Sequence, residues 1–579
     1  MERNKQMTAE IKEKYKVWSE KATADCALIK ELKEVSENEE EIFDRFYTEL
    51  KFGTAGLRGV IGAGTNRMNV YTVAQATQGL ANYLNEAFDE PSVAIGYDSR
   101  IKSDVFAREA AGVLAANGIK VYFFPHLVPT PMLSFAVRRL GCSSGIVITA
   151  SHNPSKYNGY KCYAPDGYQI TDEAAARTLE YINNIDIFND VKRMDFEDAL
   201  AEDMVDYIEG WLLNEFYDHC DSQRLDKDIC KKSGLKVIYT PLNGTGNRPV
   251  RTMLGRLGLD EIRIVPEQEN PDGKFPTCPF PNPEIDQVFE LAIEMTKDFP
   301  ADLLLATDPD CDRVGIAVRH GGEYKLMTGN EVGVMLCEYV LSRRKALGTL
   351  PEKPIVIKSF VTTDLAQVVA DKYGAEMRNT LTGFKYIGEI ISQLDEAGEA
   401  DRYVLGMEES YGYLFGSHAR DKDAVVSSTM IVEMAAYYKS LGKDLVEVME
   451  DIYAEHGMYI NTLSNFSFEG ASGMEKMKQM MDNMRTNPPK EFAGLEVIGV
   501  SDYLTSVALN TVTGEKSEID LPKSNVLQYK LPNNSCAIVR PSGTEPKIKV
   551  YITACAADRE KATALADSII ADMKKALGV

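Results

Sequence analysis

The chain has 579 residues, too many for a single hydrophobic core, so we expect three or four domains. Its hydrophobic content of 44% and charged content of 26% are typical of a soluble globular protein, and it contains no apolar run long enough to span a membrane. The formal net charge of -23 argues against a nucleic-acid partner, because phosphate backbones require clustered cations. There is no signal-peptide core at the start, and the ten cysteines show no zinc or disulfide spacing, so we expect a reducing cytoplasm.

In chain order, residues 8–50 are rich in Glu, Lys, Ala and Leu and lack Gly and Pro, which predicts a helical extension. A glycine-rich segment follows at 52–59, and its arginine, Arg58, offers a planar fork for a phosphate. Strand and helix patterns alternate over 93–149, and the alternation resumes at residue 235 and again at residue 354, which predicts three α/β units. After about residue 459 the strands lie closer together, which indicates a separate α+β domain.

Two polar loops each follow a short apolar strand in the first half of the chain. Ser151 follows the strand 144–148 on what we expect to be an exposed turn, where a serine could act as a nucleophile or carry a covalent group, although an ordinary turn remains an alternative. Asp308, Asp310 and Asp312 follow the strand 302–306. In an extended loop these alternating carboxylates would project to the same side and suit Mg²⁺, whereas an acidic surface turn is the plainer reading.

Two further loops of this kind lie in the second half of the chain. Glu408 and Ser410 follow the strand 402–405 and offer an acceptor beside a donor-acceptor, which suits two sugar hydroxyls. The last loop follows the strand 535–539 and offers a guanidinium, two hydroxyls and backbone N–H groups, which together suit a phosphate; its residues are Arg540, Ser542, Gly543 and Thr544.

Lys161 lies ten residues after Ser151. The intervening Asn158-Gly159 pair is a strong turn signal, so we expect the chain to fold back there and bring the lysine near the serine. By position alone, an ordinary surface lysine is the alternative.

These four loops, in this order, resemble the phosphoserine, metal, sugar and phosphate loops of the α-D-phosphohexomutases. The resemblance implies an α/β fold with three related domains built on mixed sheets, and a C-terminal α+β domain that closes a central cleft. We place the boundaries at 1–50 for the helical extension and at 51–210, 211–328, 329–455 and 456–579 for the four domains. One departure concerns the metal loop, where Pro309 and Cys311 stand in place of the family's more usual glycines.

The resemblance also implies roles for individual residues. It implies catalytic roles for Ser151, His152, Arg58 and Lys161, the last as a candidate general base. It implies that Mg²⁺ is held by Ser151, Asp308, Asp310 and Asp312. The implied substrate-binding residues are Arg313, Thr382, Gly383, Lys385, Glu408, Ser410, Lys422, Arg540, Ser542, Gly543 and Thr544.

The function implied is a phosphosugar mutase that interconverts glucose 1-phosphate and glucose 6-phosphate through a phosphoserine and a glucose 1,6-bisphosphate intermediate. The chain is similar to the branch that includes phosphoglucomutase-2, phosphopentomutases and glucose-1,6-bisphosphate synthases. The last two remain the nearest alternatives, because the sequence does not separate the members of this branch. Phe384 stands where other family members carry tryptophan or histidine, so the sugar preference stays open. A non-catalytic phosphosugar-binding regulator and a phosphoserine phosphatase are further alternatives. We expect a small phosphosugar as partner, with neither nucleic acid nor membrane, and the sequence indicates no oligomeric state.

Overall fold

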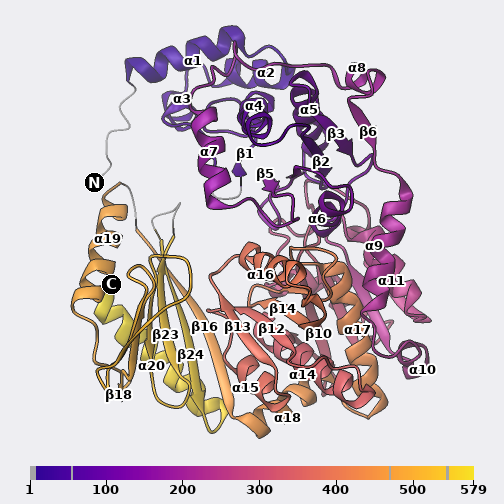
Figure 1. The fold of residues 1–579 in the computed structure, drawn as a ribbon, viewed down its shortest axis with the longest axis vertical. Helices are drawn as coiled ribbons and strands as arrows, with labels where there is room; N and C mark the ends of the chain where they lie inside the picture. The colour runs from indigo at the N-terminus through magenta and orange to yellow at the C-terminus, as the bar shows by residue number, and fades with distance from the viewer. Residues whose placement is uncertain (1–7, 54–55, 469–470, 543–546) are drawn as a thin grey trace. The chain divides into compact units, whose positions relative to one another are not determined.

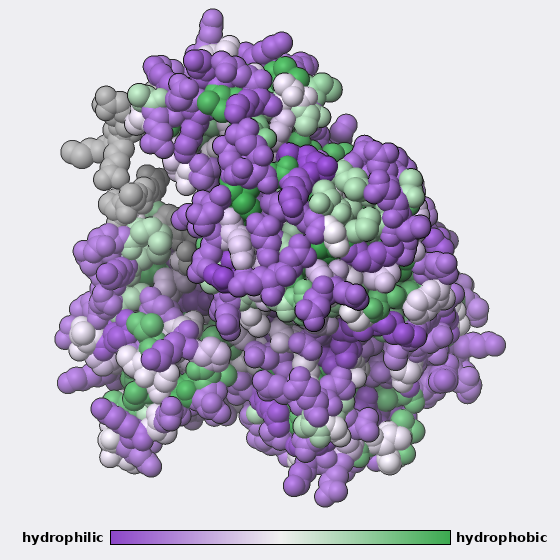
Figure 2. All heavy atoms as spheres, turned by 45° about the horizontal axis from the view of Figure 1, so that its top comes forward, coloured by the Kyte–Doolittle hydropathy of each residue, from purple (hydrophilic) through white to green (hydrophobic). Residues whose placement is uncertain are grey.

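The chain forms two compact units in the computed structural model, which is drawn in Figure 1. The first unit contains the chain up to residue 327 together with residues 387–403 and 411–442, and the second contains residues 328–386, 404–410 and 443–579. The structure describes residues 8–53, 56–468, 471–542 and 547–579. Within these ranges, the helices are all too short or too polar to cross a membrane. Figure 2 shows a mainly hydrophilic face with apolar residues in small patches.

The N-terminal extension forms three helices, α1 (Ala9–Lys21), α2 (Cys26–Glu34) and α3 (Glu39–Phe46), as the composition predicts. Each helix begins at a polar side chain that accepts a backbone hydrogen bond, the favoured way to satisfy the first N–H groups of a helix. The ring of Trp18 packs edge-on against Phe46 at 5.9 Å and against Tyr71 of the following domain at 5.6 Å. The extension is therefore part of the first domain's hydrophobic core, and Figure 1 shows it beside α4.

The first sheet has the strand order β1-β5-β4-β2-β3-β6 and is mixed. β2 pairs in parallel with β3 and β4, whereas β5 pairs antiparallel with β4 and β1. The strands are β1 (Gly56–Val60), β2 (Ser92–Tyr97), β3 (Lys120–Phe123), β4 (Ser144–Ile148), β5 (Tyr157–Tyr163) and β6 (Val205–Tyr207). The helices of this region are α4 (Val70–Ala87), α5 (Ser103–Ala116), α6 (Thr130–Arg139), α7 (Asp172–Ile182) and α8 (Phe196–Ala201).

The predicted Asn158-Gly159 turn is wrong, because both residues lie inside β5 and pair with β1. The chain reverses earlier, over residues 151–156. Gly159 is needed for close packing instead: a Cβ atom there would lie 2.4 Å from the carbonyl oxygen of Thr149. The reversal nevertheless places Lys161 beside β4, since Lys161 pairs with Val147.

The second sheet of the first unit has the order β11-β10-β9-β7-β8. β9 pairs in parallel with β7 and forms an antiparallel pair with β10, and the aspartate loop connects β9 to β10. The strands are β7 (Lys236–Thr240), β8 (Glu261–Ile264), β9 (Leu303–Thr307), β10 (Val314–His320) and β11 (Glu323–Met327). The helices before and between them are α9 (Gly210–Ser222), α10 (Ile229–Ser233), α11 (Asn247–Arg256), α12 (Pro266–Glu269), η1 (Asp286–Phe289) and α13 (Glu290–Met295).

In the third α/β region, β13 (Glu376–Thr380), β12 (Ile355–Ser359) and β14 (Tyr403–Glu408) lie side by side in this order. β12 and β13 are parallel, as expected for strands joined by a helix. The remaining elements of this stretch are α14 (Gly329–Leu347), α15 (Leu365–Lys372), α16 (Phe384–Glu396), η2 (Ala400–Arg402), β15 (Gly412–Leu414), α17 (Ala424–Ser440) and α18 (Leu445–His456).

The C-terminal region is an antiparallel sheet of order β16-β24-β23-β22-β19-β20-β21, with α20 packed against β24 and β16. Its strands are β16 (Met458–Ser467), β19 (Gly499–Asp502), β20 (Val507–Asn510), β21 (Lys516–Glu518), β22 (Leu527–Lys530), β23 (Cys536–Pro541) and β24 (Lys547–Ala556), beside the small pair β17 (Glu491–Phe492) and β18 (Leu495–Glu496). Its helices are α19 (Ala471–Thr486) and α20 (Arg559–Leu577). The predicted fold class, three α/β regions followed by an α+β region, is confirmed.

Candidate active site

Ser151 lies three residues after the end of β4, in a tight turn. Its Oγ donates to Asp308 Oδ2 at 2.9 Å and lies 3.2 Å from His152 Nδ1. The prediction of an exposed turn is wrong in one respect, since only 4% of Ser151 is exposed. Its backbone φ of 51° lies in the left-handed region, which costs a non-glycine residue about 1–2 kcal/mol, so the surroundings must hold it there.

Arg100, which the sequence analysis did not identify, holds the backbone of this loop. Its guanidinium group donates to the carbonyl oxygens of Pro154 and Tyr157, each at 3.1 Å, and to those of Ser151 and Asn153. Arg100 is buried, so these carbonyls receive charged hydrogen bonds away from water. A sequence signal was present: Arg100 follows β2 by three residues, at the same end of the sheet as Ser151.

Asp98 joins Arg100 to the serine through Thr149. The Oδ2 atom of Asp98 accepts from Thr149 Oγ1 at 2.6 Å and lies 3.3 Å from Arg100 Nε. Thr149 Oγ1 in turn accepts from the backbone N–H of Ser151 at 2.8 Å. Burial raises the pKa of Asp98 despite the opposing charge of Arg100. This buried network fixes Ser151 in its left-handed conformation.

Asp308, Asp310 and Asp312 converge in the loop after β9, and at most 2% of each is exposed. We predicted that the three carboxylates converge because alternating residues of an extended loop project to the same side. That prediction is wrong, because the loop is not extended. The backbone makes a turn in which the N–H of Cys311 donates to the Asp308 carbonyl at 2.9 Å, and Cys311 has a φ of 53°. A glycine would adopt that φ without strain, which explains why glycine is usual at this position in the resembling family.

The three aspartates fit a divalent cation. One carboxylate oxygen from each lies within 4.8 Å of the others. Asp310 Oδ1 and Asp312 Oδ1 are buried and have no hydrogen-bond partner among the described residues. Burial, followed by the neighbouring Asp310 and Asp312 charges, raises the pKa of Asp308 well above its ordinary value. A cation would relieve that repulsion, and hard oxygen donors of this kind suit Mg²⁺.

Two lysines also contact the triad. Lys161 Nζ lies 2.7 Å from Asp310 Oδ2 and 3.4 Å from Asp312 Oδ2, and Lys422 Nζ lies 3.3 Å from Asp312 Oδ2. Burial lowers the pKa of Lys161, but the charges of Asp310 and Asp312 outweigh that effect, and its pKa is raised. Lys161 is therefore an ammonium group in this arrangement. The expected proximity to Ser151 is met, because both residues contact the same acidic loop.

Arg58, Arg313 and His152 complete the predicted residues of the first unit. The pKa of His152 is lowered well below its ordinary value by burial first, and then by the positive charges of Arg313 and Arg58. His152 is therefore neutral, and both arginines act on the loop that carries Ser151. Arg58 is exposed on β1, and Arg313 Nη1 donates to Glu284 Oε1 at 2.6 Å. These cations supply the local positive charge that an anionic substrate needs on an acidic protein.

In the second unit, the predicted sugar loop contacts the segment that holds Thr382, Gly383 and Lys385, which are also implied to bind substrate. Glu408, at the end of β14, accepts a hydrogen bond from the Gly383 N–H at 2.8 Å. The neighbouring Glu409 accepts from Ser359 Oγ and Thr362 Oγ1, both at 3.1 Å, and so holds β14 to the end of β12. Of the other predicted residues, Ser410 and Thr382 are half-buried, and Lys385 Nζ lies 5.0 Å from the centre of the Tyr386 ring.

The predicted phosphate loop of the second unit begins at the end of β23. Burial and the Glu409 charge raise the pKa of Tyr551 to about 12, and the charge of Arg540 opposes this rise. Arg540 and Glu409 therefore both act on Tyr551, so the sugar and phosphate loops lie near one another. The Ser542 N–H donates to the Lys547 carbonyl at 2.7 Å. Gly543 and Thr544 lie outside the described residues.

A second cluster with metal-ligating side chains is structural. Cys220, His418 and Asp423 are buried, but His418 Nε2 is engaged by Asp423 Oδ2 at 2.9 Å. The other carboxylate oxygen of Asp423 accepts the N–H groups of Val425 and Val426 at the start of α17. Asp423 therefore caps a helix and orients a histidine.

Comparison with known sequence families matches four successive regions of the chain. Regions described as phosphoglucomutase/phosphomannomutase alpha/beta/alpha domains I, II and III match residues 49–187, 214–322 and 328–456, and a C-terminal domain of the same description matches residues 504–571. The chain therefore belongs to the phosphoglucomutase/phosphomannomutase family, the α-D-phosphohexomutases that its four loops resemble.

Curated relatives cover nearly the whole chain. A phosphoglucomutase from Staphylococcus aureus strain MRSA252 is 37% identical over 531 residues, which cover 92% of this chain and 94% of the relative. One from Staphylococcus haemolyticus is 37% identical over 511 residues, which cover 88% of this chain and 91% of the relative. Each relative is therefore matched over nine-tenths or more of its own length.

Solved structures show the same fold at lower identity. A putative phosphomannomutase from Thermus thermophilus has a TM-score of 0.67 at 23% identity and covers 91% of this chain and 99% of that structure. The open form of the Paramecium phosphoglucomutase parafusin has a TM-score of 0.68 at 18% identity and covers 92% of this chain and 95% of that structure.

Proposed function

We propose that the protein is an enzyme that interconverts glucose 1-phosphate and glucose 6-phosphate, the activity for which its curated relatives are named. The observation that carries this proposal is the hydrogen bond from Ser151 Oγ to Asp308 Oδ2, at 2.9 Å, in a buried acidic loop. A serine fixed against a cation-binding triad suits phosphoryl transfer, because its oxygen can carry the group while nearby positive charge stabilises the transfer.

The reaction exchanges one phosphoryl group at Ser151 Oγ. The bond from phosphorus to Oγ breaks as phosphorus bonds to the free hydroxyl oxygen of the sugar phosphate, and the hydroxyl proton passes through a base to the leaving Oγ. The resulting glucose 1,6-bisphosphate returns its other phosphoryl group to Ser151. Arg58 and Arg313 hold the transferring group, and the neutral His152 imidazole hydrogen-bonds it.

Lys161 is the candidate base. Asp310 and Asp312 raise its pKa, so it retains its proton while it pairs with these carboxylates. To act as the base it must first lose that proton, since only the neutral amine can accept the hydroxyl proton. Asp308, Asp310 and Asp312 would hold Mg²⁺ together with the Ser151 oxygen, and this ion would neutralise charge on the phosphoryl group.

The loops of the second unit hold the rest of the substrate in this proposal. Glu408 accepts hydrogen bonds from sugar hydroxyls, and Ser410 can both donate to them and accept from them. Thr382, Gly383 and Lys385 bind the substrate beside these two residues. Arg540, Ser542, Gly543 and Thr544 bind the phosphate that is not transferred, and Lys422 of the first unit binds a substrate phosphate. We also place the protein in the cytoplasm, because all ten of its cysteines are free thiols.

Intact-protein mass spectrometry tests the proposal. A fraction of the purified enzyme should carry one phosphate, which should be absent in Ser151→Ala, and this variant should lose nearly all mutase activity. Phosphate retained in Ser151→Ala, or full activity, would contradict the proposal. Ser155→Ala is a matched control, since this serine follows on the same loop.

The nearest alternatives differ in the sugar or in the product that is released. A phosphopentomutase would have a higher kcat/KM for ribose 1-phosphate than for glucose 1-phosphate, and a glucose-1,6-bisphosphate synthase would release the bisphosphate as its product. Side-by-side kinetics on the two sugar phosphates, with analysis of the released products, separate the three activities.

A further inference from the structure

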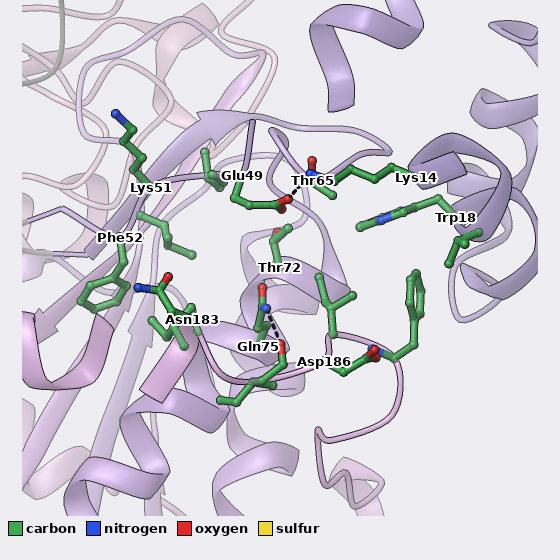
Figure 3. Close-up of a pocket in the computed structure, with 18 of the residues that line it drawn as sticks. Lys14, Trp18, Glu49, Lys51, Phe52, Thr65, Thr72, Gln75, Asn183 and Asp186 are labelled. Atoms are coloured by element: carbon green, nitrogen blue, oxygen red, sulfur yellow. Dashed lines mark hydrogen bonds and ion pairs between the residues drawn. The ribbon is translucent and has the colours of Figure 1, made fainter. Parts of the chain in front are cut away.

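A cavity of about 730 Å³ lies beneath the N-terminal extension, between α1, α4 and α7 (Figure 3). Its volume is within the range of small-molecule sites, about 300–1,000 Å³. Most of its wall is apolar: Val17 and Trp18 come from α1, Phe52 and Leu57 from the segment that leads into β1, and Phe188 from the chain after α7. The proposed phosphoryl transfer does not use this cavity, whose lining includes none of the predicted site residues.

Trp18 presents an unused hydrogen-bond donor in this cavity. Only 2% of the residue is exposed, and Figure 3 shows its indole ring extending into the cavity. Among the described residues, none accepts a hydrogen bond from the indole N–H. The indole nitrogen is itself not fully buried, so it can be reached from the cavity and can donate to a group bound there. The cavity therefore suits a ligand that brings an acceptor to Trp18.

The charges at the rim select against anions. The rim carries four carboxylates and two lysines: Glu10, Glu13, Glu49, Asp186, Lys14 and Lys51. Lys14 is already paired, with Glu49 at 2.9 Å and Glu10 at 3.5 Å. The hydrogen bond from the Phe188 N–H lowers the pKa of Asp186, so that carboxylate is ionised. The remaining negative charge favours a cation and opposes a phosphosugar.

The cavity is also separate from the phosphoryl-transfer residues. Leu57 lines the cavity and is buried, whereas the next residue, Arg58, is exposed. Successive residues of a strand point to opposite faces, so the cavity lies behind the strand that presents Arg58.

From these observations we propose that the cavity is a second ligand site, for an arylalkylamine, that is, an aliphatic amine joined by a short chain to an aromatic ring that carries a hydroxyl group. Its ring packs against Trp18 and Phe188, its hydroxyl oxygen accepts from the Trp18 N–H, and its ammonium group lies at the acidic rim beside Glu13.

Tyramine tests the proposal, with 4-hydroxyphenylacetate as the anion of the same shape. The chain has two tryptophans, and Trp211→Phe leaves Trp18 as the sole fluorescence reporter. Tyramine should change that fluorescence saturably, with a Kd on the order of millimolar for so small a ligand, and the anion should bind at least tenfold more weakly. Absence of a saturable change, or equal binding of the two probes, overturns the proposal.

Variants in the same background locate the site. Asn183→Phe, at an exposed lining position, and Val17→Phe should each weaken tyramine binding at least tenfold. Glu13→Lys should weaken it at least threefold, whereas Glu20→Lys, on the same helix but outside the lining, should not. Saturating glucose 1,6-bisphosphate should leave the tyramine Kd unchanged. Binding that survives both cavity-filling variants, responds equally to the two charge reversals, or is lost with the bisphosphate overturns the proposal.

Discussion

The guanidinium group of Arg100 donates a hydrogen bond to the backbone carbonyl oxygen of Ser151, from a buried position behind the loop. The same group also binds the carbonyls of Asn153, Pro154 and Tyr157. One planar side chain thus binds four backbone carbonyl groups of the loop that contains the serine. A lysine at this position would keep the charge but could not reach these acceptors in a fork.

We therefore predict that Arg100→Lys lowers kcat at least tenfold while changing the KM for glucose 1-phosphate less than threefold. Each charged hydrogen bond that is lost costs about 1.5–3 kcal/mol, and Arg100 acts through the position of Ser151 and not on the sugar. Arg108→Lys, at an exposed position paired with Glu197, is the control and should retain wild-type kinetics. If Arg100→Lys only lowers Tm and the folded enzyme has a normal kcat, the residue is structural.

Loss of one carboxylate from the aspartate triad should weaken metal binding. Asp310→Asn should raise the Mg²⁺ concentration needed for half-maximal activity at least tenfold, because it removes one negative ligand. A chelator should abolish wild-type activity. Titration calorimetry measures the affinity without relying on turnover, and Asp286→Asn, at an exposed position, is the control. Activity that survives exhaustive chelation would show that the triad is not a catalytic metal site.

Glu408 should act on the sugar in both reaction directions. We predict that Glu408→Ala lowers kcat/KM similarly for glucose 1-phosphate and glucose 6-phosphate, while glucose 1,6-bisphosphate still phosphorylates Ser151 in part. Glu408→Gln keeps an oxygen that can accept from the Gly383 N–H, and so separates loss of the sugar contact from loss of loop structure. A change confined to Tm, with normal kinetics, would make Glu408 a structural residue.

Arg540 should bind the phosphate that is not transferred in both orientations of the substrate. Arg540→Ala is expected to lose ten- to a hundredfold in kcat/KM with both glucose phosphates, from about 1.5–3 kcal/mol for a hydrogen bond to a charged group. Arg540→Lys should recover part of the loss, since a point charge cannot make the forked contact. Impairment with one substrate and not the other would mean that the two phosphates use separate sites.

The sequence by itself determined the fold class and pointed to the loops of the candidate site. Ser151 and the three aspartates follow short apolar strands, whereas Glu408 and Arg540 lie in the last residues of theirs. Such positions can be predicted because strand periodicity and turn chemistry are encoded in adjacent residues. The helical extension could be predicted for the same reason, since the composition of residues 8–50 is a local property of the sequence.

Tertiary structure decided what depends on residues far apart in the chain. Asn158-Gly159 has the local signal of a turn, but pairing with β1 and β4 holds it in a strand. The position of Arg100 just after β2 is a local signal, but its role is not encoded locally, because its acceptors lie more than fifty residues away. The state of Lys161 likewise depends on Asp310, which lies in a loop of the second sheet, far along the chain. Burial, hydrogen-bond partners and pKa are properties of the assembled surroundings, so only the folded chain fixes them.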